Sequence, residues 1–145
     1  RKIVFLGDGN PFYGKHHSKE TIDRVWKNEK FIKKVLKGLL KRPTSFEETI
    51  QNIVVKNNLN FRYTGNGDYL INFKNPDFIN EKEKIAIEVF HSWFKIRDYG
   101  SIEGYKDFCK SKYEPKGWKV VFIDENELKD ENLVMQKIKE FDSNA

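Results

Sequence analysis

Residues 75–90 read NPDFINEKEKIAIEVF. The run from 85 to 90 has the composition of a buried strand, because Ile, Val and Phe are favoured in strands. Glu88 stands inside this run, although glutamate is depleted in strands. Breaks of local rules are expected at functional sites, so Glu88 is a candidate functional residue.

The charged residues 81–84 suit a turn, and the whole stretch predicts a hairpin closed by Asn80 and Ile85. This register places Asp77 directly opposite Glu88, and the Cβ atoms of such partners lie about 4.5–5.5 Å apart. Two like charges at that distance destabilise each other and raise one pKa. A divalent cation removes the penalty, and oxygen ligands of this kind suit Mg²⁺ or Mn²⁺.

Two simpler interpretations of the same acids remain open. Either acid pairs with a lysine, or the register shifts by one residue and turns Glu88 towards solvent. The combination of Pro76-Asp77 with a glutamate in the next apolar strand favours the metal site over both.

The remaining sequence predicts an α/β fold with a mixed sheet flanked by helices. Residues 91–104 are predicted to be irregular, since their apolar spacing fits no regular element. The other predicted elements are a helix over 18–41 capped by Ser18, a helix from Thr44 or Ser45 to Asn57, a hairpin within 59–73 around Gly65–Asp68, a helix over 105–114, a strand over 117–124 and a helix over 130–142.

Length and composition indicate one compact domain with an appendage, because 145 residues are too few for two large domains. The single Cys109 excludes an internal disulfide, and one Cys with three His offers few ligands for a structural zinc. A reducing, cytoplasmic setting fits this composition. No apolar run or signal-peptide pattern predicts a membrane segment. Because the chain starts at Arg1, we expect an upstream portion in the natural protein.

Charge is distributed unevenly along the chain. Residues 1–43 contain 12 Lys and Arg against 4 Asp and Glu, while the whole chain has a net charge of +5. A basic extension on a nearly neutral globule indicates a nucleic-acid partner, because neutralising phosphates releases counterions. A solvated basic helix without a partner is the alternative. We therefore divide the chain into a basic DNA-binding loop and helix, residues 1–43, called the arm, and a second domain, residues 44–145.

Pro76-Asp77 followed by Glu88-Val89-Phe90 resembles the PD-(D/E)xK nuclease signature, with Phe90 where the pattern has lysine. The wider run resembles the branch that contains the very-short-patch-repair endonucleases and related homing endonucleases. The matching segments are Thr44-Ser45-Phe46-Glu47, Leu59-Asn60-Phe61-Arg62, Pro76-Asp77-Phe78, His91-Ser92-Trp93-Phe94 and Gly117-Trp118-Lys119-Val120, which together span residues 44–128.

This resemblance implies a restriction-endonuclease-like core and an active site for DNA cleavage. It implies that Asp77 is the central metal ligand, Glu88 a second ligand and the Val89 carbonyl a third. Glu47 would reach the metal, directly or through water, but with Thr44 as N-cap it occupies the capping-box position and serves its own helix instead. If Ser45 is the N-cap, Glu48 takes that position and Glu47 is available to the site.

The missing signature lysine leaves the general base and the cationic group unassigned. Histidine is the usual general base near neutral pH, so His91 is a candidate base, and Lys95 is a candidate for stabilising charge in the transition state. A histidine beside Trp93 is also compatible with a packing role.

Residues 10–21, NPFYGKHHSKET, resemble a nuclease-associated modular DNA-binding motif of the NPxYGKxHS type. Gly14 lets the backbone approach a phosphate, and the helix that starts after Ser18 directs its positive end there. The alternative is a loop that packs Phe12 and Tyr13 on the core. The candidate DNA-binding residues are Asn10, Tyr13, Gly14, Lys15, His17 and Ser18.

The sequence thus predicts a Mg²⁺-dependent DNA endonuclease that acts on double-stranded DNA without a nucleotide cofactor. A homing or mobile-element endonuclease of a bacterial, archaeal or phage-infected cell is the leading role. A very-short-patch-type repair nickase and a non-catalytic DNA-binding protein on a nuclease fold are the alternatives, and a homodimer is one of the oligomeric states that the sequence allows.

Overall fold

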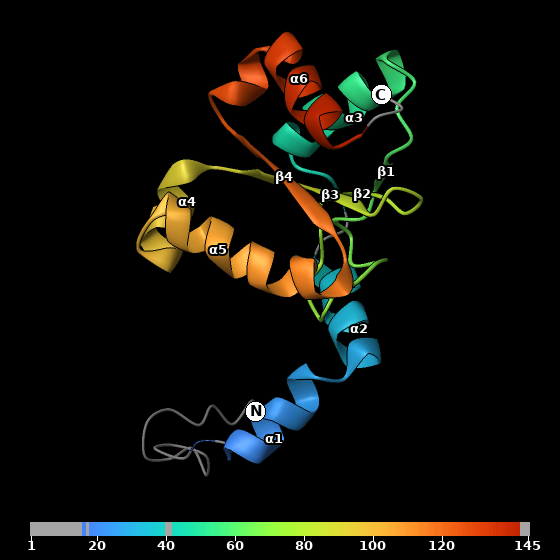
Figure 1. The fold of residues 1–145 in the computed structure, drawn as a ribbon. Helices are drawn as coiled ribbons and strands as arrows, with labels where there is room; N and C mark the ends of the chain where they lie inside the picture. The colour runs from blue at the N-terminus through green and yellow to red at the C-terminus, as the bar shows by residue number, and fades with distance from the viewer. Residues whose placement is uncertain (1–15, 17, 40–41, 143–145) are drawn as a thin grey trace, which may run out of the picture.

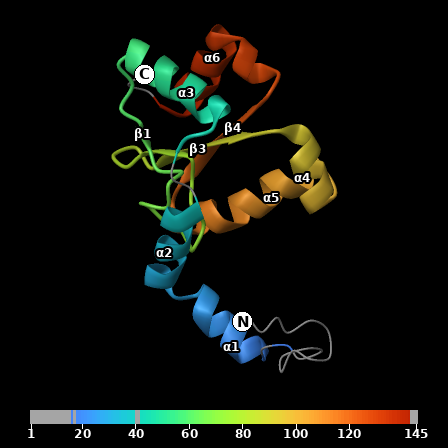
Figure 2. The same ribbon diagram turned by 180° about the vertical axis from the view of Figure 1, so that it is seen from behind.

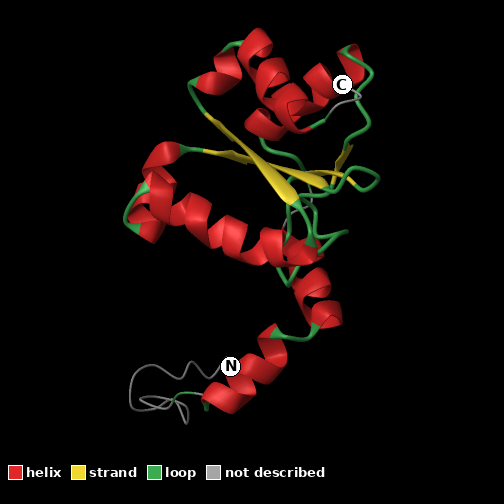
Figure 3. Ribbon diagram, viewed as in Figure 1, coloured by secondary structure: helices red, strands yellow, loops and turns green. Residues whose placement is uncertain are grey.

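The computed structural model describes residue 16 and residues 18–39 and 42–142. In this part of the chain, six α-helices and two short 3-10 helices surround one four-stranded sheet, as Figures 1 and 3 show. The elements in chain order are α1 (Lys19–Trp26), α2 (Glu29–Leu39), α3 (Ser45–Lys56), β1 (Arg62–Tyr63), β2 (Phe78–Asn80), β3 (Ile85–Phe90), α4 (Ser92–Tyr99), α5 (Ile102–Tyr113), η2 (Glu114–Lys116), β4 (Lys119–Asp124), η3 (Glu127–Lys129) and α6 (Glu131–Phe141).

The predicted hairpin and its register are confirmed. β2 and β3 are antiparallel, and the ladder pairs Asn80 with Ile85 and Phe78 with Ile87. β4 lies parallel to β3 on the other side, with α4 and α5 in the connection between them. The strand order is β1-β2-β3-β4, so the sheet is mixed, as expected.

Helices cover both faces of this sheet in three layers. α3 and α6 lie on one face, and α4 and α5 lie on the other, in both of the views in Figures 1 and 2. Side chains along β3 alternate between the layers: Ile85 and Ile87 belong to the core beneath α3 and α6, whereas Ala86 and Phe90 pack with α5. Glu88 lies two residues from both Ala86 and Phe90, so its side chain is on the same face of the sheet, towards α5.

The arm forms two helices where one was predicted. Ser18 caps α1 as expected, since its side chain accepts a hydrogen bond from the Thr21 amide. The helix ends at Trp26, and Asn28 then begins α2 by accepting from the Phe31 amide at 3.2 Å. An asparagine side chain readily accepts a hydrogen bond from a backbone amide at the start of a helix. Asn28 therefore starts a new helix, although the apolar spacing continues across it.

Two further predictions were wrong. The second strand of the hairpin predicted within 59–73 is absent: in that segment only β1 is a strand, and Ile71 and Lys74 form an isolated bridge. Residues 92–99, predicted to be irregular, form α4. Its N-cap is His91, whose Nδ1 accepts from the Trp93 amide at 3.3 Å, and Gly100 ends it with a φ of 79°.

α2 is held against the turn that follows β1. Ile32 is buried, and Lys37 forms a salt bridge with Asp68 at 3.3 Å. Gly67, with a φ of 86°, lies so close to α2 that a Cβ on it would be 2.6 Å from the Leu36 Cβ. α1 continues beyond α2 away from the sheet (Figure 1). The division of domains after residue 43 stays a prediction.

None of the described helices is both long enough and apolar enough to cross a lipid bilayer.

Candidate active site

A cavity of about 680 Å³ opens on the α5 face of the sheet, and we call it the acid cavity. Its lining comes from the arm, from the start of α3, from the end of the β1–β2 loop, from β3 and from α4 and α5. The charged residues that line it are Glu47, Lys74, Asp77, Glu88, Lys95 and Lys112.

Asp77 lies just before β2, with its side chain directed towards β3. Its Oδ2 accepts a hydrogen bond from the Val89 amide at 2.8 Å, and its carbonyl accepts from the amides of Thr64 and Gly65. No buried side-chain polar atom of the described residues lacks a partner, and Asp77 Oδ1 accepts no hydrogen bond from them. Oδ1 is therefore reached by solvent and is available to a ligand.

Glu88 is almost fully enclosed, with 4% of its surface exposed. Its Oε1 accepts from Lys74 Nζ at 2.8 Å and from the Tyr113 hydroxyl, and its Oε2 accepts from the Tyr105 hydroxyl at 3.0 Å. Each carboxylate oxygen has about two acceptor sites. One site therefore remains on Oε2, so Glu88 can give a ligand a single further contact.

The two acids influence each other, as the opposed arrangement predicts. Burial, reinforced by the negative charge of Glu88, raises the pKa of Asp77 well above its ordinary value. Burial lowers the pKa of Lys74, but Glu88 and the other neighbouring acidic groups together outweigh this effect and leave the pKa raised. Lys74 thus balances Glu88, while Asp77 carries charge that these neighbours leave unbalanced.

Glu47 caps its own helix and also lines the acid cavity. Thr44 is the N-cap of α3, and Glu47 completes the capping box, with its Oε2 accepting from the Thr44 amide at 2.7 Å. The same oxygen accepts from the Tyr63 hydroxyl at 3.2 Å. Glu47 nevertheless lines the acid cavity, so its capping role does not remove it from the site.

Aromatic rings and two further lysines form the rest of the cavity wall. Lys95 Nζ lies 4.6 Å from the centroid of the Tyr105 ring, and Lys112 Nζ lies 5.8 Å from that of Phe108. Trp26 from the arm, together with Phe73 and Tyr99, completes an apolar rim. Lysines interleaved with aromatic rings suit a nucleic-acid strand, which has both phosphates and base faces.

The structure separates His91 from this group. His91 is exposed and is not among the residues that line the cavity; its ring stacks on Phe46, with centroids 6.2 Å apart, and its Nδ1 lies 3.9 Å from Glu125. Phe90 is buried between Tyr105 and Phe122. The position at which the signature has lysine therefore serves the core.

The donor set suits a hard cation with few protein ligands. No group of three or more His, Cys, Asp and Glu side chains in the described ranges could hold a metal by itself. Asp77 Oδ1, one site on Glu88 Oε2 and the Val89 carbonyl would leave most positions of an octahedron to water and phosphate, which is the usual situation of Mg²⁺. These residues fit Mg²⁺ or Mn²⁺.

The three residues that donate hydrogen bonds to Glu88, namely Lys74, Tyr105 and Tyr113, were missed at the level of sequence, as was Lys112 in the cavity wall. The two tyrosines, with Cys109 midway between them, recur every four residues along α5 and therefore share one helix face. That spacing could have indicated polar groups directed at the sheet. Lys74 gave no such signal, because it lies in an irregular loop.

Of the predicted DNA-binding residues, Asn10, Tyr13, Gly14, Lys15 and His17 lie outside the described residues, and only Ser18 is placed, at the start of α1. Residues 5–24 match the NUMOD3 motif, a nuclease-associated DNA-binding motif. No curated protein matches the chain significantly. The arm thus contains a DNA-binding motif that is associated with nucleases, and its helices border a cavity that contains three carboxylates.

Proposed function

We propose that this protein is a metal-dependent DNA endonuclease whose arm holds the duplex and whose acid cavity hydrolyses a phosphodiester bond. One observation supports the proposal most strongly. Asp77, just before β2, and Glu88, on β3, converge on a cavity that is also bordered by Trp26, Ile32 and Leu36 of the arm. A DNA strand held by the arm would therefore pass the acids.

The roles of the side chains follow from their contacts. Asp77 presents Oδ1 to the ligand while the Val89 amide fixes Oδ2, and Glu88 is held rigidly by two tyrosines and a lysine. Mg²⁺ bound at these oxygens would polarise the phosphate and lower the pKa of the attacking water. Lys95 and Lys112 attract the strand, and the aromatic rim excludes water from it.

The chain order supports a restriction-endonuclease-like core of the type that the signature implies. A helix, α3, precedes an antiparallel hairpin that carries both acids, and a helical connection leads to the parallel strand β4. The acids lie beside each other at the point where the hairpin opens. Fold likeness alone does not determine activity, so the proposal rests on the site.

Within this activity, a homing or mobile-element endonuclease is the role that we favour, because a nuclease-associated DNA-binding motif precedes the acid cavity. A repair nickase of the very-short-patch type is the alternative. The two are distinguished by comparing matched and mismatched duplexes of the same sequence, since only the nickase prefers the mismatch.

One observation favours a second candidate, a non-catalytic DNA-binding protein. Glu88 already has three hydrogen-bond donors from the protein, so the buried pair with Lys74 is stable without a metal. In this case the acid cavity would be the remnant of an active site.

Plasmid cleavage by the full chain separates these candidates. The wild type is incubated with supercoiled DNA in Mg²⁺, Mn²⁺ or EDTA, beside Asp77→Ala and the matched surface control Asp98→Ala. We expect cleavage only with metal, loss of at least a hundredfold in Asp77→Ala with DNA binding retained, and full activity in the control. DNA binding without cleavage by the wild type in either metal would leave the non-catalytic candidate instead.

A further inference from the structure

The loop before Pro76 holds Lys74 in one position. Ile71 and Lys74 exchange backbone hydrogen bonds at 2.8 and 3.0 Å. The next residue, Asn75, donates its side-chain amide to the carbonyls of Thr64 at 2.6 Å and Tyr69 at 2.9 Å. The backbone is thus held on both sides of Lys74, and the side chain of Lys74 extends from it to Glu88.

The ammonium group at the end of that side chain has hydrogen-bonding capacity left over. Lys74 Nζ donates to Glu88 Oε1, its one acceptor among the described residues, and lies 5.4 Å from the centroid of the Tyr113 ring. An ammonium has three donors, so two remain. The side chain is 18% exposed and borders the acid cavity. The remaining donors are therefore directed to a ligand or to solvent in that cavity.

A purely structural role does not explain this arrangement well. Enclosing a lysine and a glutamate costs several kcal/mol of hydration per ion, and apolar replacements are often as stable. Each carboxylate oxygen of Glu88 already accepts a hydrogen bond from a tyrosine hydroxyl, without Lys74. An ion pair with a purely structural role would also be fully enclosed, whereas the Lys74 side chain is partly exposed and lines the acid cavity.

The other cations of the cavity are placed differently. Lys95 lies over the rings of Tyr105 and Tyr99, and Lys112 lies beside Phe108. Neither forms an ion pair with Asp77 or Glu88. Among the three lysines that line the acid cavity, Lys74 is thus the one that contacts Glu88 directly. A phosphate held through a cation at Asp77 and Glu88 would lie beside the two remaining N–H groups of Lys74.

We propose that Lys74 is a catalytic residue whose ammonium, held on Glu88, contacts the scissile phosphate. The positive charge at the phosphate would therefore come from Lys74, in the loop before β2. The position on β3 where the signature has lysine is occupied by Phe90, which is buried in the core. This inference rests on the proposed endonuclease function.

Four full-length variants test the role of Lys74. Lys74→Gln keeps an N–H donor for Glu88 without the charge, Lys74→Met keeps the length of the stem, and Lys74→Arg keeps the charge. The matched control is Lys106→Gln, on α5 but outside the acid cavity, where the lysine lies 5.7 Å from the centroid of Phe122. Each protein is assayed for thermal melting, for Mn²⁺ affinity without DNA, and for single-turnover cleavage.

We expect Lys74→Gln and Lys74→Met to cleave 10²–10³-fold more slowly, which is typical for the loss of one group that stabilises transition-state charge. Their Mn²⁺ affinity should equal that of the wild type or exceed it several-fold, because a neighbouring positive charge has been removed. Lys74→Arg should cleave at least tenfold faster than the two uncharged variants, and Lys106→Gln should cleave as fast as the wild type.

Two results would overturn the assignment while leaving the endonuclease intact. One is cleavage within threefold of the wild type by either uncharged variant that melts normally. The other is a parallel loss of Mn²⁺ affinity and cleavage, which would make Lys74 a support for Glu88 only. Failure of the wild type to cleave with any metal contradicts the proposed function itself, and the assignment of Lys74 with it.

Discussion

At the scale of single residues, Asp77 is predicted to reduce the stability of the metal-free protein. Burial and the charge of Glu88 raise its pKa, so between the ordinary and the raised pKa the folded state binds more protons than the unfolded state. Stability then falls as the pH rises through that window. Asp77→Asn, measured by urea unfolding in EDTA, should be more stable at pH 7 by an amount of order 1 kcal/mol and should lose this slope.

The control for that measurement is Asp98→Asn. Asp98 is exposed, and a hydrogen bond from Arg97 lowers its pKa. Its substitution should not change the decrease in the free energy of unfolding as the pH rises. Added Mg²⁺ should stabilise the wild type and not Asp77→Asn; equal stabilisation of both would place the cation elsewhere.

Glu47 permits a second test at the same scale, because its capping role and its charge are separable. Glu47→Gln keeps oxygen acceptors for the Thr44 amide and the Tyr63 hydroxyl but removes a negative charge from the cavity wall. We expect unchanged thermal melting and a several-fold weaker Mn²⁺ affinity in a titration, since the lost attraction is electrostatic. An unaltered affinity would restrict Glu47 to capping α3.

Sequence reasoning located Asp77 and Glu88 because their relation is local. A hairpin turn and its register fix both residues within twelve positions of chain, and the observed ladder agrees. Lys74 and Tyr113 reach the same carboxylate from an irregular loop and from a helix 25 residues further on. Such contacts depend on tertiary packing, which periodicity does not encode.

At the scale of elements, the contact between α2 and the turn after β1 depends on the absence of a side chain at Gly67. Gly67→Ala adds a Cβ that would lie 2.6 Å from the Leu36 Cβ, at a φ of 86°. Gly100→Ala is the matched control, because its φ of 79° causes similar strain with no atom within 4 Å.

We expect both alanine variants to lose about 1 kcal/mol to backbone strain, and Gly67→Ala to lose more in chemical denaturation. Hydrogen exchange should show the additional loss in α2. If the two variants were equally stable, α2 would not be docked closely on this turn.

Elements with a clear apolar face were predicted and those without one were not. β4 and α6 each bury core residues, and both were expected from their patterns. α4 has no buried residue, so no apolar stripe marked it, and its termini are set by His91 and Gly100. In the segment 69–73, alternating residues suggested a strand, but Asn72 and Phe73 adopt positive φ angles that end any ladder.

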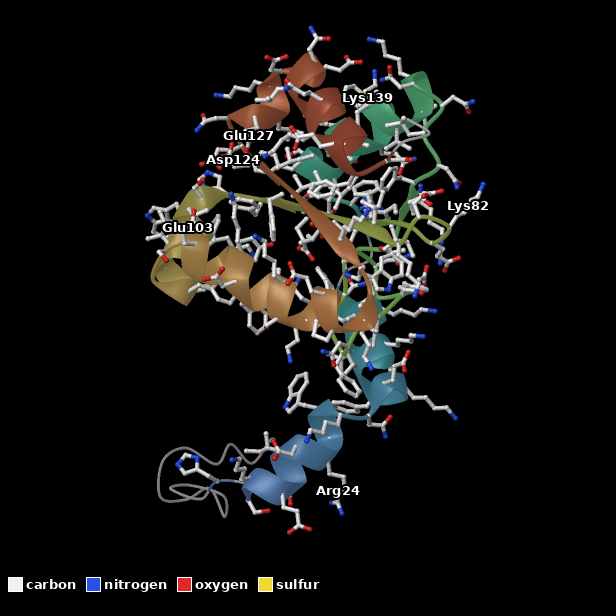
Figure 4. All side chains as sticks on the ribbon, in the orientation of Figure 1. Arg24, Lys82, Glu103, Asp124, Glu127 and Lys139 are labelled. Carbon is white, nitrogen blue, oxygen red and sulfur yellow. The ribbon has the colours of Figure 1, made fainter. Side chains whose placement is uncertain are left out.

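At the scale of the whole molecule, exposed positive charge lies on the arm and also at the far end of the second domain. Arg24 lies on α1 and Lys139 lies on α6 at the opposite end of the molecule (Figure 4). Lys27, Lys30 and Lys34 of the arm are exposed. Replacing these three with Gln should weaken DNA binding in EDTA and reduce the slope of log K against log salt by up to about 3, because each phosphate contact contributes about 0.9.

The matched control replaces the exposed lysines Lys82, Lys129 and Lys139, which lie outside the arm. These changes remove the same net charge and should leave the slope nearly unchanged. Equal effects of the two triple variants would indicate that DNA contacts the protein without preference for the arm.

The most direct test of the metal site is a crystal of the full chain grown with a DNA duplex and Mn²⁺, examined at a wavelength where Mn²⁺ scatters anomalously. An anomalous peak about 2.1 Å from Asp77 Oδ1 and from Glu88 Oε2, with a phosphate oxygen completing the coordination, is the expected result. The absence of a peak between these carboxylates, with DNA bound and Mn²⁺ in excess, would contradict it.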